Sequence, residues 1–203
     1  MSHLRLENRH TGEVLDIRRT RERGVECLEL RGTLPPRRQG AILHVHHTQD
    51  EEGFVTAGVL SAMVDGTVIQ AGPGELVSLP RGVPHSWWNA GDEPLAFQGM
   101  ARPAADLDRY LQAVFDVMNR SPADRPSLFY LAHASLRHRE TQRVILMPAW
   151  IQTPLFQLIV AVGTLLGRYR GIEWPGCPAK CSGAPPPAQP DTPSDLHRHP
   201  RGT

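Results

Sequence analysis

The sequence has few cysteines, few aromatic residues and no excess of charge of either sign. Its 203 residues include 3 Cys, an odd number that does not suit the paired framework of a small secreted disulfide domain. Lys and Arg total 22 against 21 Asp and Glu, so the net field is too weak to predict a nucleic acid as partner. The N-terminal segment also lacks the apolar run of a secretory signal. We therefore expect a reducing, cytoplasmic location and no nucleic-acid partner.

Glycine (18) and proline (19) are abundant, which argues against a helical bundle. From about residue 4 to residue 102, short apolar or alternating runs are separated by turns that contain Gly or Pro. Such spacing is typical of an antiparallel β-sandwich or β-barrel. Asp65-Gly66 lies between two of these runs and predicts a tight hairpin, because both residues tolerate the positive φ of a type I′ turn.

Beyond residue 103 the pattern changes to helical periodicity. Apolar residues at helical spacing predict an amphipathic helix that closes one side of the β structure: Leu107, Leu111, Val114, Phe115 and Met118. A second stretch, residues 144–167, contains no charged residue and raises the question of a membrane span. Pro148 and Pro154 would interrupt its helix and leave a segment too short to cross a bilayer, so membrane association is possible but not favoured.

These patterns divide the chain into three parts. We expect a β domain over residues 1–103, a helical extension over 104–170 that packs on the β domain or on a second copy, and a disordered Pro/Gly-rich tail over 171–203. A basic cluster in the extension, His133, Arg137, His138 and Arg139, is interpreted as a solvated face. The apolar stretch that needs cover predicts a homodimer.

Three histidines and one glutamate form the candidate site. His44 and His46 are two residues apart in a β-type run, so their side chains leave the same face of the strand. Glu51 opens the next strand, and His85 begins a later strand after the turn Pro80-x-Gly82. Three imidazoles and one carboxylate are donors that suit a divalent transition metal. The sequence therefore predicts a metal site inside the β structure.

At this point the sequence resembles the cupin superfamily. The first cupin motif, H-x-H-x4-E-x6-G, is matched by His44, His46, Glu51 and Gly58, although Gly40 lies four residues before His44 where the motif's leading glycine lies six before. The second motif, G-x5-P-x-G-x2-H-x3-N, is matched by Gly74, Pro80, Gly82, His85 and Asn89. The resemblance covers about residues 38–100 and implies a mainly β fold: an antiparallel cupin (jelly-roll) β-barrel with a C-terminal helical extension.

The resemblance also implies the chemistry of the site. His44, His46, His85 and Glu51 would hold one divalent metal, for which we expect Fe, with Mn, Zn, Ni or Cu as alternatives. Glu51 is predicted as the catalytic residue, a ligand that can also act as general base. Met63, Trp87 and Phe97 are predicted to line the pocket for a small-molecule substrate.

Three functions fit this site. The first is a dioxygenase that acts on a small, aromatic or polyphenolic molecule, similar to quercetinase-type cupins. The second is a non-redox metalloenzyme, such as a zinc-dependent polyketide cyclase or an isomerase. The third is a cupin that binds a small ligand without turnover, since one fold can host unrelated functions. The ligand set alone does not separate the three.

Overall fold

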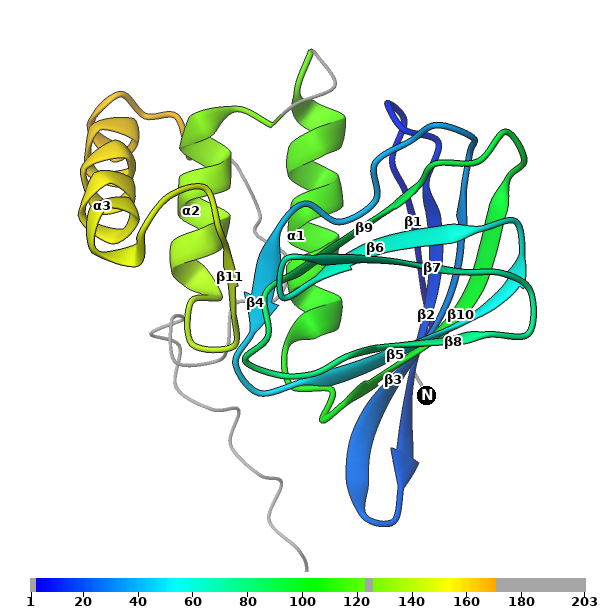
Figure 1. The fold of residues 1–203 in the computed structure, drawn as a ribbon. Helices are drawn as coiled ribbons and strands as arrows, with labels where there is room; N and C mark the ends of the chain where they lie inside the picture. Colours follow the sequence, from blue (N-terminus) through cyan, green and yellow to red (C-terminus); the bar gives the residue numbers. More distant parts are fainter. Residues whose placement is uncertain (1–2, 123–125, 171–203) are drawn as a thin grey trace, which may run out of the picture.

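In the part of the chain that the structure describes, the fold consists of two antiparallel β-sheets and three helices, with the helices gathered on one side (Figure 1). A computed structural model of the chain describes residues 3–122 and 126–170. One sheet has six strands in the order β1-β2-β3-β10-β5-β8, and the other has five in the order β11-β4-β9-β6-β7. The strands of the first sheet are β1 (His3–Glu7), β2 (Val14–Glu22), β3 (Val25–Leu34), β5 (Asp50–Ala57), β8 (Leu76–Leu79) and β10 (Leu95–Arg102). Those of the second are β4 (His44–His46), β6 (Leu60–Val64), β7 (Thr67–Ala71), β9 (His85–Asn89) and β11 (Gln142–Val144).

Two clusters of apolar side chains hold these layers together. One lies between the sheets and joins residues of β3, β5, β8 and β10 to residues of β6 and β7: Leu34, Val55, Leu60, Ala62, Ala71, Val77, Leu79 and Leu95. The other joins the strands β1, β2 and β3 to the helix α1 (Leu107–Arg120) through residues that include Leu15, Ile17, Leu28 and Phe115. Burial of these side chains supplies the main stabilisation of the fold. The mainly β architecture predicted from the sequence is confirmed.

The turns confirm the hairpin that the sequence predicts. Asp65 and Gly66 have φ of 49° and 78°, and they join β6 to β7 with Val64 opposite Thr67, as a type I′ hairpin requires. Gly58, the last residue of the first motif, has φ of 72°, and a Cβ at this position would lie 2.6 Å from the Pro94 carbonyl oxygen. This turn separates β5 from β6.

The helices confirm one prediction and correct two others. The predicted amphipathic helix is α1, whose predicted apolar face points toward the β structure. Pro154 was expected to interrupt the second apolar stretch, but α3 (Ala149–Leu165) continues through it. Pro154 lies in the second turn, where a proline removes one backbone hydrogen bond and the helix still continues on both sides. Within the described residues, no helix is long and apolar enough to cross a membrane.

The basic cluster is the second correction. His138 is 2 % exposed and its Nδ1 lies 2.6 Å from Asp106 Oδ2, so it is a buried polar contact that ties the end of α2 (Leu128–Arg137) to the start of α1. This contact leaves no pattern in a single sequence, because Asp106 and His138 are 32 positions apart. The expected tail, residues 171–203, lies outside the described residues.

Candidate metal centre

The structure brings His44, His46, Glu51 and His85 into one cluster. One donor atom from each residue lies within 4.8 Å of the donor atoms of the other three. The residues come from three strands of two sheets: β4 carries His44 and His46, β9 carries His85, and β5 carries Glu51. His44 is paired directly with His85, and alternation along β4 places His46 on the same face as His44. Strand β11 pairs with the other edge of β4 and covers it.

The hydrogen bonds of two imidazoles fix which nitrogen atom is free to bind a metal. His44 Nδ1 lies 2.7 Å from the Ile42 carbonyl oxygen, and His85 Nδ1 lies 2.9 Å from that of Val83. A carbonyl oxygen only accepts hydrogen bonds, so each Nδ1 carries the proton and donates it. In the neutral ring, Nε2 then has a free lone pair. Backbone carbonyls commonly orient metal-binding histidines in this way.

The free atoms converge on one point. His44 Nε2 is 3.0 Å from His46 Nε2, while Glu51 Oε2 is 3.4 Å from His46 Nε2 and 3.7 Å from His85 Nε2. Atoms that bind one ion at about 2.0–2.1 Å lie roughly 3.0–3.4 Å from each other. His85 Nε2 is also buried without a hydrogen-bond partner among the described residues. These distances and this orphaned nitrogen fit a transition-metal ion.

The charges of the cluster favour a cation as well. Burial lowers the pKa of His44 to about 4, and the neighbouring His46 and His85 act in the same direction. Burial also lowers the pKa of His46. Burial alone would raise the pKa of Glu51, but the surrounding histidines outweigh it and bring this pKa down to about 2. At neutral pH, His44 and His46 are therefore neutral and Glu51 is an anion, a state that a divalent cation can bind without displacing a proton.

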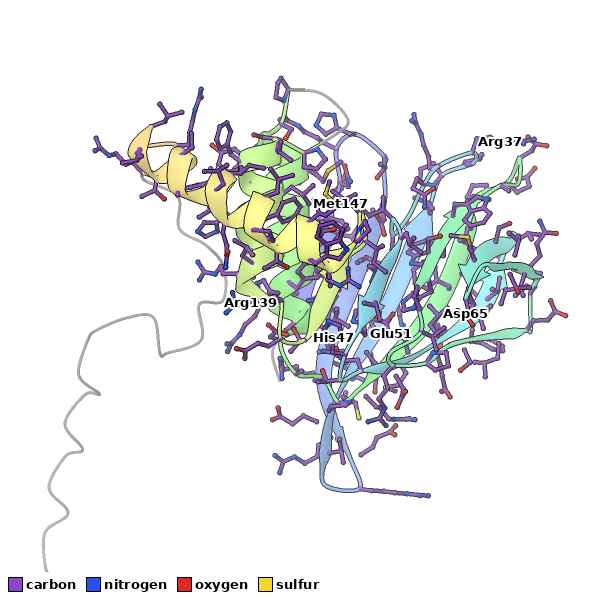
Figure 2. The ribbon with its side chains drawn as sticks, turned by 60° about the vertical axis from the view of Figure 1, so that its left-hand side comes forward. Arg37, His47, Glu51, Asp65, Arg139 and Met147 are labelled. Carbon is purple, nitrogen blue, oxygen red and sulfur yellow. The ribbon has the colours of Figure 1, made fainter. Side chains whose placement is uncertain are left out.

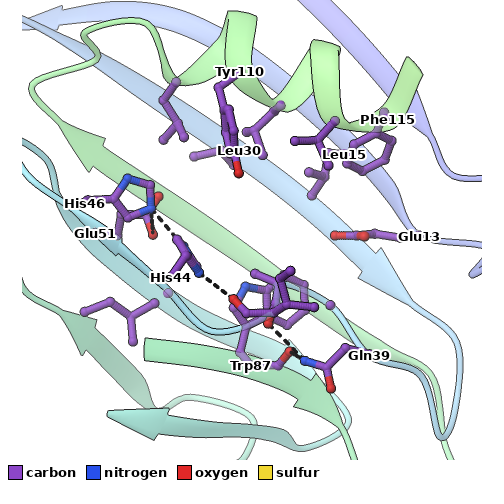
Figure 3. Close-up of a pocket in the computed structure, with 18 of the residues that line it drawn as sticks. Glu13, Leu15, Leu30, Gln39, His44, His46, Glu51, Trp87, Tyr110 and Phe115 are labelled. Atoms are coloured by element: carbon purple, nitrogen blue, oxygen red, sulfur yellow. Dashed lines mark hydrogen bonds and ion pairs between the residues drawn. The ribbon is translucent and has the colours of Figure 1, made fainter. Parts of the chain in front are cut away.

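The metal-ligand cluster borders a cavity of about 390 Å³ (Figure 3). This volume falls in the usual range for small-molecule sites. The cavity walls come from both sheets and from α1, and they are mostly apolar. Its wall residues on α1 are Leu107, Tyr110, Leu111, Val114, Phe115 and Met118. The amphipathic helix predicted from the sequence therefore contributes one wall of the cavity.

Two of the three predicted pocket residues line this cavity. Trp87 and Phe97 contact each other edge to face with ring centroids 5.1 Å apart. The backbone of Gly40 packs so closely on the Trp87 ring that any side chain at position 40 would overlap with it. Met63 is not among the lining residues. It follows Ala62, the residue opposite Trp87, so alternation points Met63 to the other face of the sheet.

Neighbours of the cluster that resemble ligands lie outside it. His47 is exposed, and its backbone N–H donates to the Thr141 carbonyl oxygen at 2.7 Å (Figure 2). Glu52 is exposed and its carboxylate is not part of the cluster, although the residue borders the cavity.

Sequence reasoning missed several polar residues of the cavity, Glu13 and Tyr110 among them. Neither belongs to a motif. Tyr110 follows Leu107 by one helical turn, so its position on the apolar face of α1 was the available signal. For Glu13 no signal existed in the sequence.

Comparison with known proteins gives a family and several partial likenesses. Residues 30–99 match the family model described as the cupin domain. The oxidoreductase iacF of Pestalotiopsis fici is 35% identical over 79 residues, which are 37% of this chain and 39% of that protein. The chain thus spans about two fifths of the length of this curated relative.

Solved structures give weaker likenesses. A sugar phosphate isomerase of the cupin superfamily from Silicibacter pomeroyi is 25% identical, with 43% of this chain and 58% of that chain covered and a TM-score of 0.37. A nucleoside dehydratase from Streptomyces is 12% identical, with 52% and 80% covered and a TM-score of 0.42. The family match rests on the same segment that carries both histidine motifs and the cluster. The chain is a cupin-domain protein.

Proposed function

We propose that the protein is a metal-dependent oxidoreductase, a dioxygenase that acts on a small, largely apolar molecule of aromatic or polyphenolic type. One observation carries this proposal: three imidazole nitrogens and one carboxylate oxygen converge beside an apolar cavity of small-molecule size. The 35% identical oxidoreductase of Pestalotiopsis fici supports the reaction class.

His44, His46, His85 and Glu51 are the residues that would hold the metal. Imidazole and carboxylate donors suit iron and manganese, and such an ion would supply redox chemistry and Lewis acidity. The carbonyls of Ile42 and Val83 accept from Nδ1 of His44 and His85, which leaves Nε2 of both rings available to such an ion. Glu51 remains ionised, which suits a ligand, whereas a pKa as low as about 2 makes it a weak base.

The cavity walls would bind and orient the substrate. Trp87 and Phe97 present an edge-to-face aromatic pair to the cavity, a surface that suits a flat molecule. The apolar residues of α1 close the opposite side and limit the entry of water. A site of low polarity strengthens each electrostatic interaction between the cluster and a bound oxygen atom of the substrate.

Oxygen consumption tests this proposal. The full chain, loaded with iron under anaerobic conditions, is mixed with a panel of catechols and flavonols, and O2 uptake is recorded with an electrode. Glu51→Gln should keep the fold, checked by circular dichroism, and lose at least 100-fold in turnover. Glu93→Gln makes the same chemical change at an exposed position outside the cavity and should behave as the wild type.

Three results would count against a dioxygenase. Turnover without O2, or turnover only in the zinc-loaded protein, would indicate a non-redox isomerase or cyclase. Tight binding of the panel without turnover by any metal form would indicate a ligand-binding cupin.

A further inference from the structure

The cavity contains one buried acid, Glu13, that has no partner among the residues that the structure describes. Glu13 is 7 % exposed and borders the cavity. Across residues 3–122 and 126–170, no side chain or backbone group forms a hydrogen bond or an ion pair with its carboxyl group. Figure 3 shows this carboxyl group pointing into the cavity.

Hydrogen bonds hold the backbone around Glu13 and so fix the point from which its side chain extends. Glu13 N–H donates to Thr11 Oγ1 at 3.2 Å, and its carbonyl accepts from Asn8 N–H at 2.8 Å. The Asn8 side chain in turn accepts from the N–H of His10 at 3.0 Å. This loop leads directly into β2, so Glu13 lies immediately before Val14, the first residue of that strand.

An unpartnered acid in such a place destabilises the protein unless a ligand binds it. Burial raises the pKa of Glu13 to about 7, because the ionised form loses its hydration and gains no compensating charge. A glutamine or a leucine would avoid this cost. Buried polar groups that lack a protein partner are expected to have another one.

Glu13 lies far from the metal-ligand cluster. Val14 of β2 pairs with Thr33 of β3, and Thr33 pairs with Ala96 of β10. Glu13, one residue before Val14, therefore lies at the same position along the strand direction as Leu95 of β10. Glu51 pairs with Ala101 of β10, which lies six positions after Leu95. At roughly 3.3 Å per residue, Glu13 and Glu51 are therefore separated by about 20 Å along the strand direction. Figure 3 shows Glu13 and the pair His46 and Glu51 at opposite sides of the cavity, with apolar side chains between them.

We propose that Glu13 is the specificity-determining residue of the cavity: it accepts a hydrogen bond from a hydroxyl or amino group at the far end of an elongated, otherwise apolar ligand. This inference rests on the proposed function for the other end of the ligand, the end at the metal-ligand cluster. In that proposal an oxygen atom of the ligand lies beside His44, His46 and Glu51. The ligand class is then a flat, elongated molecule with polar groups at its two ends only.

Stilbenes with one or two polar ends test the proposal. The probes are 4-hydroxystilbene, 4,4′-dihydroxystilbene and 4-aminomethyl-4′-hydroxystilbene. Their affinities are measured by isothermal titration calorimetry on the full chain in its zinc-loaded and metal-stripped forms. Zinc is chosen because it undergoes no redox change. The variants are Glu13→Gln, Glu13→Leu and, as a matched control outside the cavity, Glu93→Gln.

The wild type should bind a probe with a second polar end about tenfold more tightly than 4-hydroxystilbene, the gain expected for a hydrogen bond to a carboxylate. Glu13→Leu should reduce this preference to less than twofold, and Glu13→Gln should keep part of it because its amide oxygen still accepts. Glu93→Gln should leave it unchanged. The tighter of the two bipolar probes identifies the donor as a hydroxyl or an amine.

An equal preference in the wild type and Glu13→Leu would overturn the proposal, as would a wild type that binds none of the stilbenes. Failure of the proposed function gives a different result. Suppose that every probe binds equally to the zinc-loaded and the metal-stripped protein, while the preference for a second polar end still depends on Glu13. The role of Glu13 is then supported, and a metal that binds the other end of the ligand is contradicted.

Discussion

At the scale of single residues, Glu13 makes a contribution to stability that changes with pH. Its pKa is raised to about 7 in the folded protein from an ordinary value of 4.5, so the folded state binds more protons than the unfolded state between these values. The free energy of unfolding therefore falls as pH rises from 4.5 to 7, by up to about 1.4 kcal/mol per pH unit for this group. Below pH 4.5 the carboxyl group is protonated in both states and has no such cost.

Glu13→Gln removes this titration. We expect the variant to match the wild type near pH 4.5 and to exceed its free energy of unfolding by about 3 kcal/mol above pH 7, as a raised pKa of this size requires. Urea unfolding at half-unit steps from pH 4.5 to 8, with Glu93→Gln as control, measures the difference. Parallel stability profiles for the wild type and Glu13→Gln would show that the carboxyl group has a partner or is hydrated.

The residue scale also shows what local spacing in the sequence can predict. His44, His46, Glu51 and His85 were found because strand alternation and two tight turns fix their faces, and these are local properties. Glu13 comes from a loop that precedes β2, and only the packing of the first sheet against α1 brings it to the cavity. Contacts that depend on such non-local packing leave no pattern in a single sequence.

At the scale of secondary structure, the strands in which apolar and polar residues alternate could be predicted from the sequence, and so could the amphipathic helix α1. Strands β1 and β11 and helix α2 could not, because each is short and its burial depends on a neighbour far along the chain. Gln142 and Val144 of strand β11 are buried, and they pair with His46 and His44 of β4. The C-terminal part of the chain therefore supports the candidate metal centre.

Gln152 links the helix α3 to this strand. Its side chain is 3 % exposed, Nε2 donates to the Val144 carbonyl oxygen at 2.7 Å, and Oε1 accepts from Leu146 N–H at 3.1 Å. Gln152→Ala leaves these buried backbone groups unpaired, so the free energy of unfolding should fall by about 2–3 kcal/mol. Thermal unfolding followed by circular dichroism checks this.

Gln157→Ala serves as the control on the same helix, because Gln157 is exposed. Equal stability losses in Gln152→Ala and Gln157→Ala would contradict the linking role of Gln152.

At the scale of the whole molecule, α3 leaves a broad apolar surface exposed. It packs on α2 and lies on the outer side of the helices, with Gln152 as its link to strand β11 (Figure 1). Large side chains of this surface are open to solvent: Trp150 (78 %), Leu158 (61 %), Leu165 (86 %) and Leu166 (61 %). An apolar surface of this kind on a chain of globular composition is typical of an interface. We propose that two copies of the chain pair through α3.

Size-exclusion chromatography with light scattering tests the proposed pairing. The wild type at about 20 μM should have the mass of two chains, and the double variant Leu158→Glu with Leu165→Glu should have the mass of one, since charges on the paired surface lose hydration. The matched change Val68→Glu, on the exposed strand β7, should remain a dimer. A wild type with the mass of one chain would refute the proposal.

The central claim is that His44, His46, Glu51 and His85 bind one transition-metal ion, and metal content tests it most directly. The full chain is purified without a histidine tag and without added metal, anaerobically and aerobically, and its metals are measured by inductively coupled plasma mass spectrometry. We predict about one transition-metal ion per chain in the wild type and less than a tenth of that in His44→Ala and His85→Ala, with His47→Ala, at an exposed neighbouring position, as the unchanged control. A metal-free wild type under both conditions, or a wild-type amount of metal in His44→Ala and His85→Ala, would contradict this claim.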